Sequence, residues 1–328
     1  MAEWLFERGI GEDRAILVEN CAILEARIAL PGATRAGTIA PGRLTTILVP
    51  GRRGIVALDQ GGECLIEPLP ARLTEGEAIR VEIVREGVPE AGRTKLAKCR
   101  LSDHPVKEGP MLRESLIGKV IEIGPNDPDR FEQAGWSELL EEANTGEVAF
   151  AGGALRMSLT PAMTLFDVDG ALDPAELAVA GAAAAGRTIR RFAIGGSIGI
   201  DLPTLAERAA RQAAAAALDD VLPPPFERTA VNGFGFLQIV RRRARPSLPE
   251  MLLSDPAGAA ARALLRRAER RVGGGSLTLA AAPAVIARIE RNPPWLDALA
   301  RTIGAPVCLQ AQPGLAISAG HVHSQIAC

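Results

Sequence analysis

Alternating apolar and polar residues dominate the first hundred positions and predict β-strands. Residues 4–8 and 14–18 alternate on either side of turn-forming residues 9–13, which predicts a β-hairpin, and a third strand is expected over 22–30. Residues 37–103 contain short apolar stretches separated by Gly, Pro and Asp at turn positions. This spacing predicts a small five-stranded barrel of the OB type, with an open sheet as the alternative.

Helical and strand-like patterns alternate in the rest of the chain. Residues 104–126 indicate a linker with one short strand, and residues 127–143 have the apolar spacing of a helix. An α/β unit is predicted over 147–248, with strands at 155–159, 163–168, 198–200 and 229–241 and helices at 175–192 and 205–218. A second small unit is predicted over 250–328, with helices at 257–272, 283–291 and 296–303 and strands at 276–281 and 307–312.

Composition places the chain among ordinary globular proteins. Hydrophobic residues make up 47% and charged residues 23%. The first residues have no basic region followed by an apolar stretch, and no apolar run reaches the roughly 18 residues of a membrane span. The 5 cysteines are scattered without a CxxC pair, which favours a reducing compartment. We therefore expect a cytoplasmic protein.

The net charge of −2 limits how this chain could hold a nucleic acid. A protein that relied on bulk charge would be strongly basic, so any RNA site must be a local patch. Tyrosine is absent and aromatic residues make up 3% of the chain. Few rings are therefore available for stacking on RNA bases.

Two aspartates follow the apolar run that ends at Phe166. Asp167 and Asp169 are two residues apart, so on a strand their carboxylates share one face. Carboxylates placed in this way can hold a hard cation such as Mg²⁺. The alternative is an ordinary turn, because Asp and Gly often end strands.

A third aspartate, Asp201, follows the glycine pair Gly195-Gly196 and a short apolar strand. It could instead cap the helix expected to begin near residue 203. However, one helix separates this strand from the one that carries Asp167, as in a βαβ unit, whose strands end at the same edge of a parallel sheet. Two carboxylates brought together there repel each other unless a cation lies between them. The sequence therefore predicts a metal site at Asp167 and Asp201.

Two further clusters leave alternatives open. Arg241, Arg242, Arg243 and Arg245 could bind phosphate or could simply be a solvated strand exit. His321, His323 and Cys328 could form a metal cluster, although a frayed terminus is the simpler interpretation.

Three segments in order resemble the catalytic core of the ribonuclease E/G family. The first runs from Gly152-Gly153 through two strands to Asp167-Val168-Asp169. The second is Gly195-Gly196 to Asp201. The third contains Phe234-Gly235-Phe236-Leu237, then Arg241, Arg243 and Pro246-Ser247-Leu248.

The resemblance implies a mixed α+β or α/β fold with an RNase H-like/DNase I-like catalytic core. Residues 1–36 would be a hairpin belonging to that core, and 37–103 a reduced OB-like RNA-binding insert. Residues 104–250 would form the metal-dependent nuclease core, and 251–328 a small C-terminal α/β domain.

The family resemblance also implies a function in RNA processing or decay. It predicts an Mg²⁺-dependent endoribonuclease, with Mn²⁺ as an alternative ion, that cleaves single-stranded RNA to 5′-phosphate and 3′-hydroxyl ends. Asp167 and Asp201 would be the catalytic metal ligands, and Asp169 replaces a family asparagine and could also ligate the metal. RNA would be held by Lys95, Lys98, Arg93, Arg241 and Arg243. A non-catalytic RNA-binding protein and a phosphoesterase of small nucleotides are the alternatives.

The chain departs from the family pattern in several places. The cysteine pair for a shared zinc is missing, so we expect no zinc and no zinc-linked tetramer, while a homodimer stays open. About 45 residues between barrel and core leave no room for a 5′-monophosphate sensor domain, and residues 37–103 contain no aromatic ring. Pro161 and Thr204 replace acidic residues that accompany the family's active site.

Overall fold

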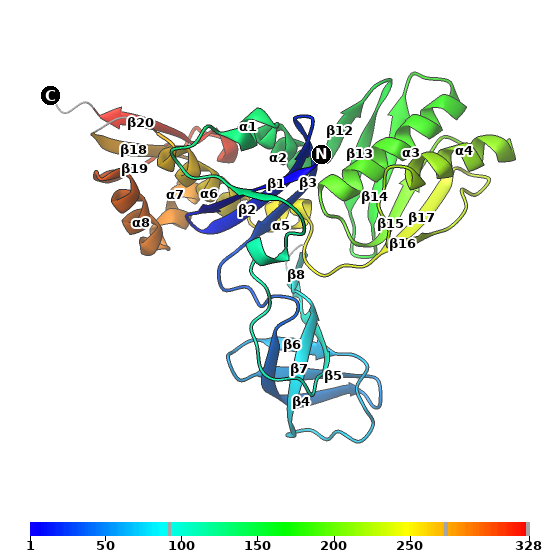
Figure 1. The fold of residues 1–328 in the computed structure, drawn as a ribbon, viewed down its shortest axis with the longest axis horizontal. Helices are drawn as coiled ribbons and strands as arrows, with labels where there is room; N and C mark the ends of the chain where they lie inside the picture. Colours follow the sequence, from blue (N-terminus) through cyan, green and yellow to red (C-terminus); the bar gives the residue numbers. More distant parts are fainter. Residues whose placement is uncertain (91–92, 272–274, 326–328) are drawn as a thin grey trace.

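The computed structural model describes residues 1–90, 93–271 and 275–325. In these residues the chain is a mixed α+β protein with eight α-helices, a closed five-stranded barrel and four further sheets. Figure 1 shows three lobes around the N-terminal sheet: the barrel at the bottom, an α/β lobe at the right and the C-terminal lobe at the left. No helix among the described residues is long and apolar enough to cross a bilayer.

The N-terminal sheet joins the lobes. Its order is β11-β1-β2-β3, from β1 (Glu3–Gly9), β2 (Glu12–Glu19), β3 (Ala22–Ala29) and β11 (Val120–Glu122). Strands β1 and β2 form the predicted hairpin, and β11 returns after the barrel to pair in parallel with β1. Leu5 and Ile16 belong to the same core as the α/β lobe, whereas Trp4 and Phe6 on the other face form a cluster with Leu112 from the linker. The linker also contains the 3-10 turn η1 (Arg113–Ser115).

Residues 39–101 contain the closed barrel. Its strands are β4 (Ile39–Val49), β5 (Arg53–Leu58), β6 (Glu63–Ile66), β7 (Ala78–Arg85) and β10 (Ala97–Leu101), in the order β10-β6-β5-β4-β7. Buried Leu44, Val56 and Val81 fill the interior. The five-stranded barrel predicted from turn spacing is confirmed, and the open sheet is excluded. A two-stranded ribbon, β8 (Val88–Glu90) and β9 (Arg93–Lys95), lies where the barrel meets the other lobes.

The α/β lobe is a six-stranded sheet with the order β12-β13-β14-β15-β17-β16. Its strands are β12 (Glu147–Phe150), β13 (Gly153–Leu159), β14 (Thr164–Gly170), β15 (Gly196–Asp201), β16 (Phe226–Arg228) and β17 (Phe236–Arg241), and its helices are α3 (Pro174–Arg191) and α4 (Arg208–Asp219). Strands β14 and β15 are parallel and are connected by α3, while the other neighbours are antiparallel. The predicted βαβ unit is therefore present.

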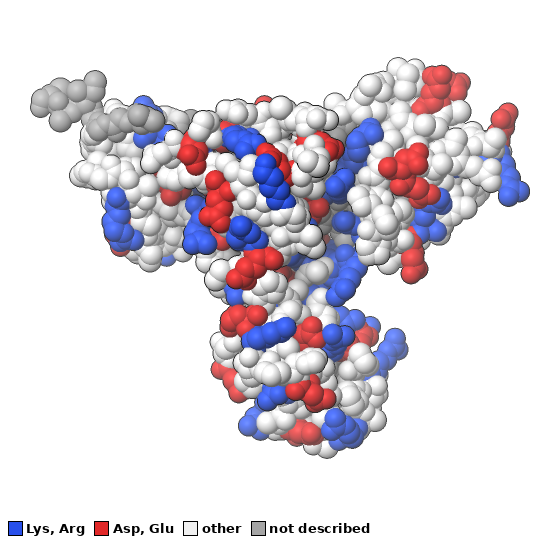
Figure 2. Space-filling view, in the orientation of Figure 1, with Lys and Arg blue, Asp and Glu red and all other residues white. Residues whose placement is uncertain are grey.

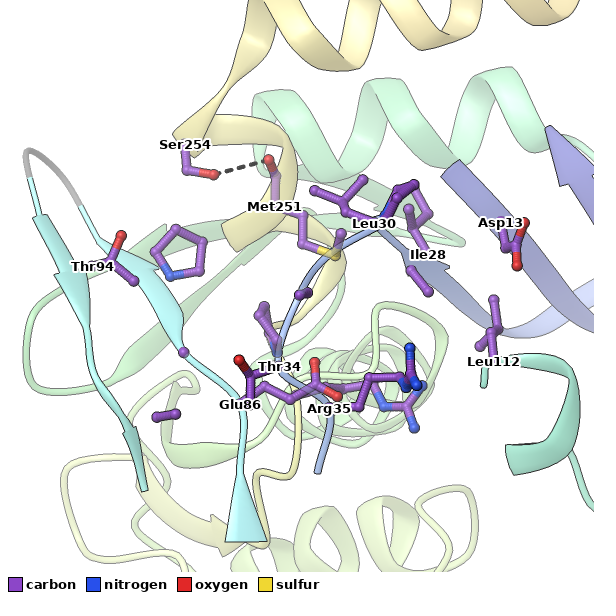
Figure 3. A pocket seen from close by; sticks show the side chains of 18 of the residues that line it. Asp13, Ile28, Leu30, Thr34, Arg35, Glu86, Thr94, Leu112, Met251 and Ser254 are labelled. Atoms are coloured by element: carbon purple, nitrogen blue, oxygen red, sulfur yellow. Dashed lines mark hydrogen bonds between the residues drawn. The ribbon is translucent and has the colours of Figure 1, made fainter. Parts of the chain in front are cut away.

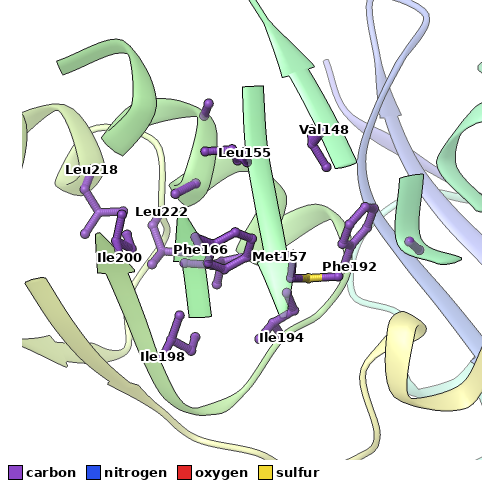
Figure 4. Close-up of a cluster of buried hydrophobic side chains, with 14 of the residues drawn as sticks. Val148, Leu155, Met157, Phe166, Phe192, Ile194, Ile198, Ile200, Leu218 and Leu222 are labelled. Carbon is purple, nitrogen blue, oxygen red and sulfur yellow. The ribbon is translucent and has the colours of Figure 1, made fainter. Parts of the chain in front are cut away.

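Helices cover one face of this sheet. Phe166, Ile198 and Ile200 are fully buried in the cluster shown in Figure 4. Helix α3 packs so closely that a Cβ on Gly181 would lie 2.4 Å from Val168 Cγ1. Because side chains alternate along a strand, the residues between these buried positions point to the opposite face, which the helices leave open.

Two expected elements of this region differ in the structure. The helix expected over 127–143 is split into α1 (Arg130–Gln133) and α2 (Trp136–Thr145), because Gly135 between them has a φ of +91°. The strand expected over 229–241 begins only at Phe236, because residues 229–235 form the loop that joins β16 to β17.

The C-terminal lobe has the sheet order β19-β18-β20. Its elements are α5 (Leu248–Ser254), α6 (Pro256–Glu269), β18 (Ser276–Ala281), α7 (Pro283–Glu290), α8 (Pro293–Ile303), β19 (Val307–Ala311), η2 (Ile317–Ala319) and β20 (His321–Gln325). The frayed terminus expected around His321 and His323 is wrong, because β20 pairs with β18 and Val322 packs against the core of the lobe. Cys328 and residues 272–274 lie outside the described residues.

Candidate active site

Asp167 and Asp201 lie side by side on the open face of the α/β sheet. They are direct partners in the parallel register of β14 and β15, and both are exposed. Neighbouring strands are about 4.8 Å apart, so the two carboxylates leave the sheet next to each other. The alternative role of Asp201 as a helix cap does not apply, since Asp201 ends β15 and α4 begins at Arg208.

Asp169 is on the same face, two residues beyond Asp167. Its Oδ2 lies 3.0 Å from Nη1 of Arg156, and both side chains are more than half exposed. Arg156 is the cross-strand partner of Asp167, so it stands between the two aspartates and β12. Asp167 is in the middle of β14, which extends to Gly170, and not at the strand end that the sequence suggested.

The donor set suits a cation that needs few protein ligands. No group of three or more His, Cys, Asp or Glu side chains within the described residues is arranged to hold a metal ion. Mg²⁺ commonly uses one or two carboxylates and completes its shell with water and substrate phosphate. Asp167 and Asp201 meet that requirement, and Asp169 is engaged by Arg156.

An apolar floor lies beside the two acids. Phe236 is the cross-strand partner of Asp201. A Cβ on Gly199 would lie 2.6 Å from Cζ of Phe236 and 2.8 Å from Cδ2 of Leu165, so these side chains meet above the glycine. The absence of a side chain at Gly199 thus leaves room for the rings and methyl groups of Phe236 and Leu165.

A basic cleft of about 720 Å³ lies at the edge of the sheet where β14 and β15 begin. It lies between the barrel-side ribbon β8–β9, the β13–β14 turn and helix α5. Its charged lining residues are Arg85, Arg93, Lys95, Arg243, Glu90 and Glu250. Thr164 also lines it and is three residues before Asp167, a distance of about 10 Å along a strand, with its side chain buried on the opposite face from that of Asp167. Figure 2 shows Lys and Arg side chains gathered where the α/β lobe meets the barrel.

The basic side chains that line the cleft outnumber the acidic ones. Arg93 and Lys95 share Glu90, at 2.9 and 2.6 Å. Arg243 lies 3.2 Å from Glu250 and donates to the Gly195 carbonyl at 2.9 Å. A Cβ on Gly196 would lie 2.9 Å from Nη2 of Arg243, so the glycine pair makes room for this guanidinium.

Arg85 gives the strongest indication that the cleft binds an anion. Burial lowers its pKa, and the nearby charge of Arg243 lowers the pKa further. Its Nε is buried without a hydrogen-bond partner among the residues that the structure describes, while its Nη2 donates to the Leu96 carbonyl. A desolvated guanidinium beside a second one favours an anion such as a phosphate. No pattern in the sequence points to Arg85, because it ends the barrel strand β7, far along the chain from Arg243.

The structure separates the residues expected to bind RNA. Arg93, Lys95 and Arg243 line the cleft, but Lys98 and Arg241 do not. Lys98 Nζ lies 2.7 Å from Glu67 on the barrel, and its hydrogen bond, together with that of Arg53, lowers the pKa of Glu67 to about 2.

Arg241 and Arg245 have different surroundings from Arg243. Arg241 donates to the Ile194 carbonyl at 3.0 Å, and burial lowers its pKa. Arg245 lines a second cavity of about 520 Å³ between the N-terminal sheet, the barrel and α5. Figure 3 shows that cavity with Glu86, whose pKa is raised by burial, among mainly apolar side chains. Asp167, Asp169 and Asp201 do not line it, so this cavity is separate from the open sheet face that carries these three residues, here called the acidic face.

No protein-family model matches the sequence, and no curated protein matches it. The resemblance to the ribonuclease E/G family therefore rests on the three segments and their order. These segments lie together in the structure, because they supply β13, β14, β15 and β17 of one sheet.

Proposed function

We propose that this protein is a Mg²⁺-dependent endoribonuclease that cleaves single-stranded RNA to 5′-phosphate and 3′-hydroxyl ends. The pairing of Asp167 with Asp201 on an exposed sheet face carries the proposal. The basic cleft about 10 Å away along β14 supports it, since a phosphodiester chain could occupy both places at once. The nature of the products follows from the family resemblance.

In this proposal, different side chains bind the metal ion and the RNA phosphates. Asp167 and Asp201 would hold Mg²⁺, or Mn²⁺ in its place, and the ion would stabilise the charge that develops on the phosphate oxygens. Arg85, Lys95 and Arg243 bind the flanking phosphates and so fix the position of the strand. Arg156 holds Asp169 and limits the negative charge around the two ligands.

The scaffold supports the same proposal. In the barrel, β6 and β10 are parallel and the other pairs are antiparallel, an arrangement that fits an OB-type insert for RNA. The six-stranded sheet with one parallel crossover fits a nuclease core of the RNase H-like/DNase I-like kind. We propose membership of the ribonuclease E/G family on this combination.

The test is to replace Asp167 and Asp201 separately by Asn and to assay cleavage of single-stranded RNA with Mg²⁺. Each variant should lose at least about a hundredfold in kcat/KM, because several kcal/mol of transition-state stabilisation depend on the ion. Asp220→Asn is the matched control, since Asp220 is an exposed aspartate of the same lobe at the end of α4. Unchanged cleavage by either ligand variant would refute the assignment.

A non-catalytic RNA-binding protein is the second candidate. Pro161, which lines the cleft, and Thr204 replace acidic residues that the family resemblance would place near the site. This candidate predicts RNA binding that weakens steeply with salt, without turnover at any Mg²⁺ or Mn²⁺ concentration.

A further inference from the structure

Phe234 is displayed to solvent beside the acidic face. The chain has 8 Phe and 3 Trp residues, all within the described residues, and among these Phe234 alone is exposed, with 82% of its surface accessible. Aromatic side chains normally contribute to cores or interfaces through their large apolar area. A single ring left in water next to a candidate active site therefore calls for a ligand.

The loop that carries Phe234 is held in one shape. Asn232 Oδ1 accepts from the backbone N–H of Phe234 at 2.9 Å and from that of Phe236 at 3.0 Å. The N–H of Asn232 donates to the Phe236 carbonyl at 3.0 Å. These bonds fix the backbone on both sides of the ring, so the ring is presented at little entropic cost to binding.

The same loop is fastened to the strand end that carries Asp201. Leu202 donates its N–H to the Gly235 carbonyl at 3.2 Å. Gly235 has a φ of +95°, and a Cβ there would lie 2.2 Å from the Leu202 carbonyl oxygen, so the two backbones are in close contact. Thr204 Oγ1 lies 3.5 Å from the Phe234 carbonyl. The backbone at Phe234 is thus fixed against the end of β15 that carries Asp201, two residues before Phe236 of the apolar floor.

We propose that Phe234 stacks on a nucleobase next to the phosphate that is cleaved, an inference that rests on the proposed function. Every base has a π-face, so stacking tolerates any sequence. It requires an unpaired base, however, because the bases of a duplex already stack on each other. Phe234 therefore selects single-stranded RNA at a site where the barrel offers no aromatic ring.

The experiment combines a ring deletion with a base deletion. Wild type, Phe234→Ala and Phe234→Tyr are assayed on a short single-stranded RNA with one cleavage site. They are also assayed on versions of this RNA in which one nucleotide beside that site is abasic. Phe234→Ala should reduce kcat/KM about tenfold on the intact RNA, and Phe234→Tyr should retain most of it. On the RNA that lacks the stacked base, wild type and Phe234→Ala should be equal. Ile117→Ala is the matched control, because Ile117 is 91% exposed and lies in the linker.

The outcomes separate this inference from the function beneath it. If wild type neither binds nor cleaves RNA, the proposed function fails and stacking fails with it. If wild type cleaves and Phe234→Ala cleaves equally well, only the stacking is overturned. A loss in Phe234→Ala that is the same on intact and on every abasic RNA would also overturn it, because that pattern indicates a structural role.

Discussion

Two groups of charged residues in this protein differ in almost every physical respect. The first lies buried between the β1–β2 hairpin and helix α6, and its members are Glu7, Glu12, Arg14, Arg262, Arg266 and Arg270. The second is the exposed group of Asp167, Asp169 and Asp201 on the open sheet. In the buried group Glu12 accepts from Arg262 at 2.7 Å and from Arg266 at 2.5 Å. In the part of the chain that the structure describes, Asp167 and Asp201 have no ion-pair partner.

The difference in burial indicates a structural role for the first group and a ligand-binding role for the second. A charge taken out of water must be compensated by partners, and removing one partner leaves the other uncompensated. The buried group meets this condition even at Arg14. Its two Nη atoms are buried and have no hydrogen bond among the described residues, but its guanidinium lies 4.0 Å from the Phe131 ring centroid. It therefore attaches the C-terminal lobe to the N-terminal hairpin. The exposed acids are hydrated by water, which a cation can displace.

The largest expected effect is on stability, from Glu12→Gln. This change removes the carboxylate that Arg262 and Arg266 share, and leaves Arg266 with Glu7 at 3.2 Å and Arg262 with Asp255 at 3.9 Å. Removing one partner of a buried ion pair costs about 3–5 kcal/mol. The free energy of unfolding, measured in urea, should fall by that amount. Glu122→Gln is the control, because its pair with Arg113 is exposed at 3.0 Å and should be worth about 0.5 kcal/mol. Equal effects of the two variants would remove the contrast between buried and exposed charge.

The pH dependence of stability should sharpen the same contrast. Burial alone would raise the pKa of Glu12, but Arg266 and Arg262 more than offset it, so the pKa lies below its ordinary value of 4.5. A depressed carboxyl pKa stabilises the fold above the unfolded value, and the contribution is lost as the pH falls through the folded one. The stability difference between wild type and Glu12→Gln should therefore be constant at neutral pH and shrink below about pH 4.5. A difference that persists undiminished to pH 2 would contradict this origin.

The helices and strands that depend on neighbouring residues could be predicted from the local sequence pattern. The helix expected over 175–192 is α3, which spans Pro174–Arg191, and Asp173 caps it by accepting from the Ala175 N–H with Oδ1 at 3.0 Å. The pairing of Asp167 with Asp201 could also be predicted, because a strand–helix–strand unit places its two strands side by side and parallel, although Asp167 lies in the middle of β14 and not at its end. The loop within 229–241 was missed although Asn232 and two glycines signal a turn, since the apolar residues around them suggested one continuous strand.

The contacts between residues far apart in the chain could not be predicted from the sequence. Strand β20 depends on pairing with β18, and nothing in its own residues indicates that partner. The cleft combines Arg85 from a barrel strand with Arg243 from the other lobe, while Arg241, two residues before Arg243, lies outside the cleft and donates to the Ile194 carbonyl. A cluster of arginines predicts positive charge, but only the backbone path decides which guanidinium reaches the cleft.

On the open face, Asp201→Asn should affect stability little. The change removes one of two neighbouring like charges and breaks no ion pair, so the free energy of unfolding should stay within about 0.5 kcal/mol of wild type or rise slightly. Urea unfolding of the variant whose cleavage has been assayed provides the measurement. A loss of several kcal/mol would mean that Asp201 supports the fold, and any lost activity could then no longer be assigned to the metal.

Asp169→Asn should have the smallest effect on cleavage, and its effect on stability should also be small, because an exposed ion pair such as that with Arg156 is worth about 0–1 kcal/mol. Its activity decides whether Asp169 binds the cation. The family resemblance implies Asn at this position, and Arg156 already engages the carboxylate, so we expect less than a tenfold loss of kcat/KM and no change in the Mg²⁺ concentration for half-maximal cleavage. Asp167→Asn should differ on both measurements. If Asp169→Asn raised the Mg²⁺ requirement as much as Asp167→Asn does, then Asp169 would be a ligand, and Arg156 would have to release it whenever the ion binds.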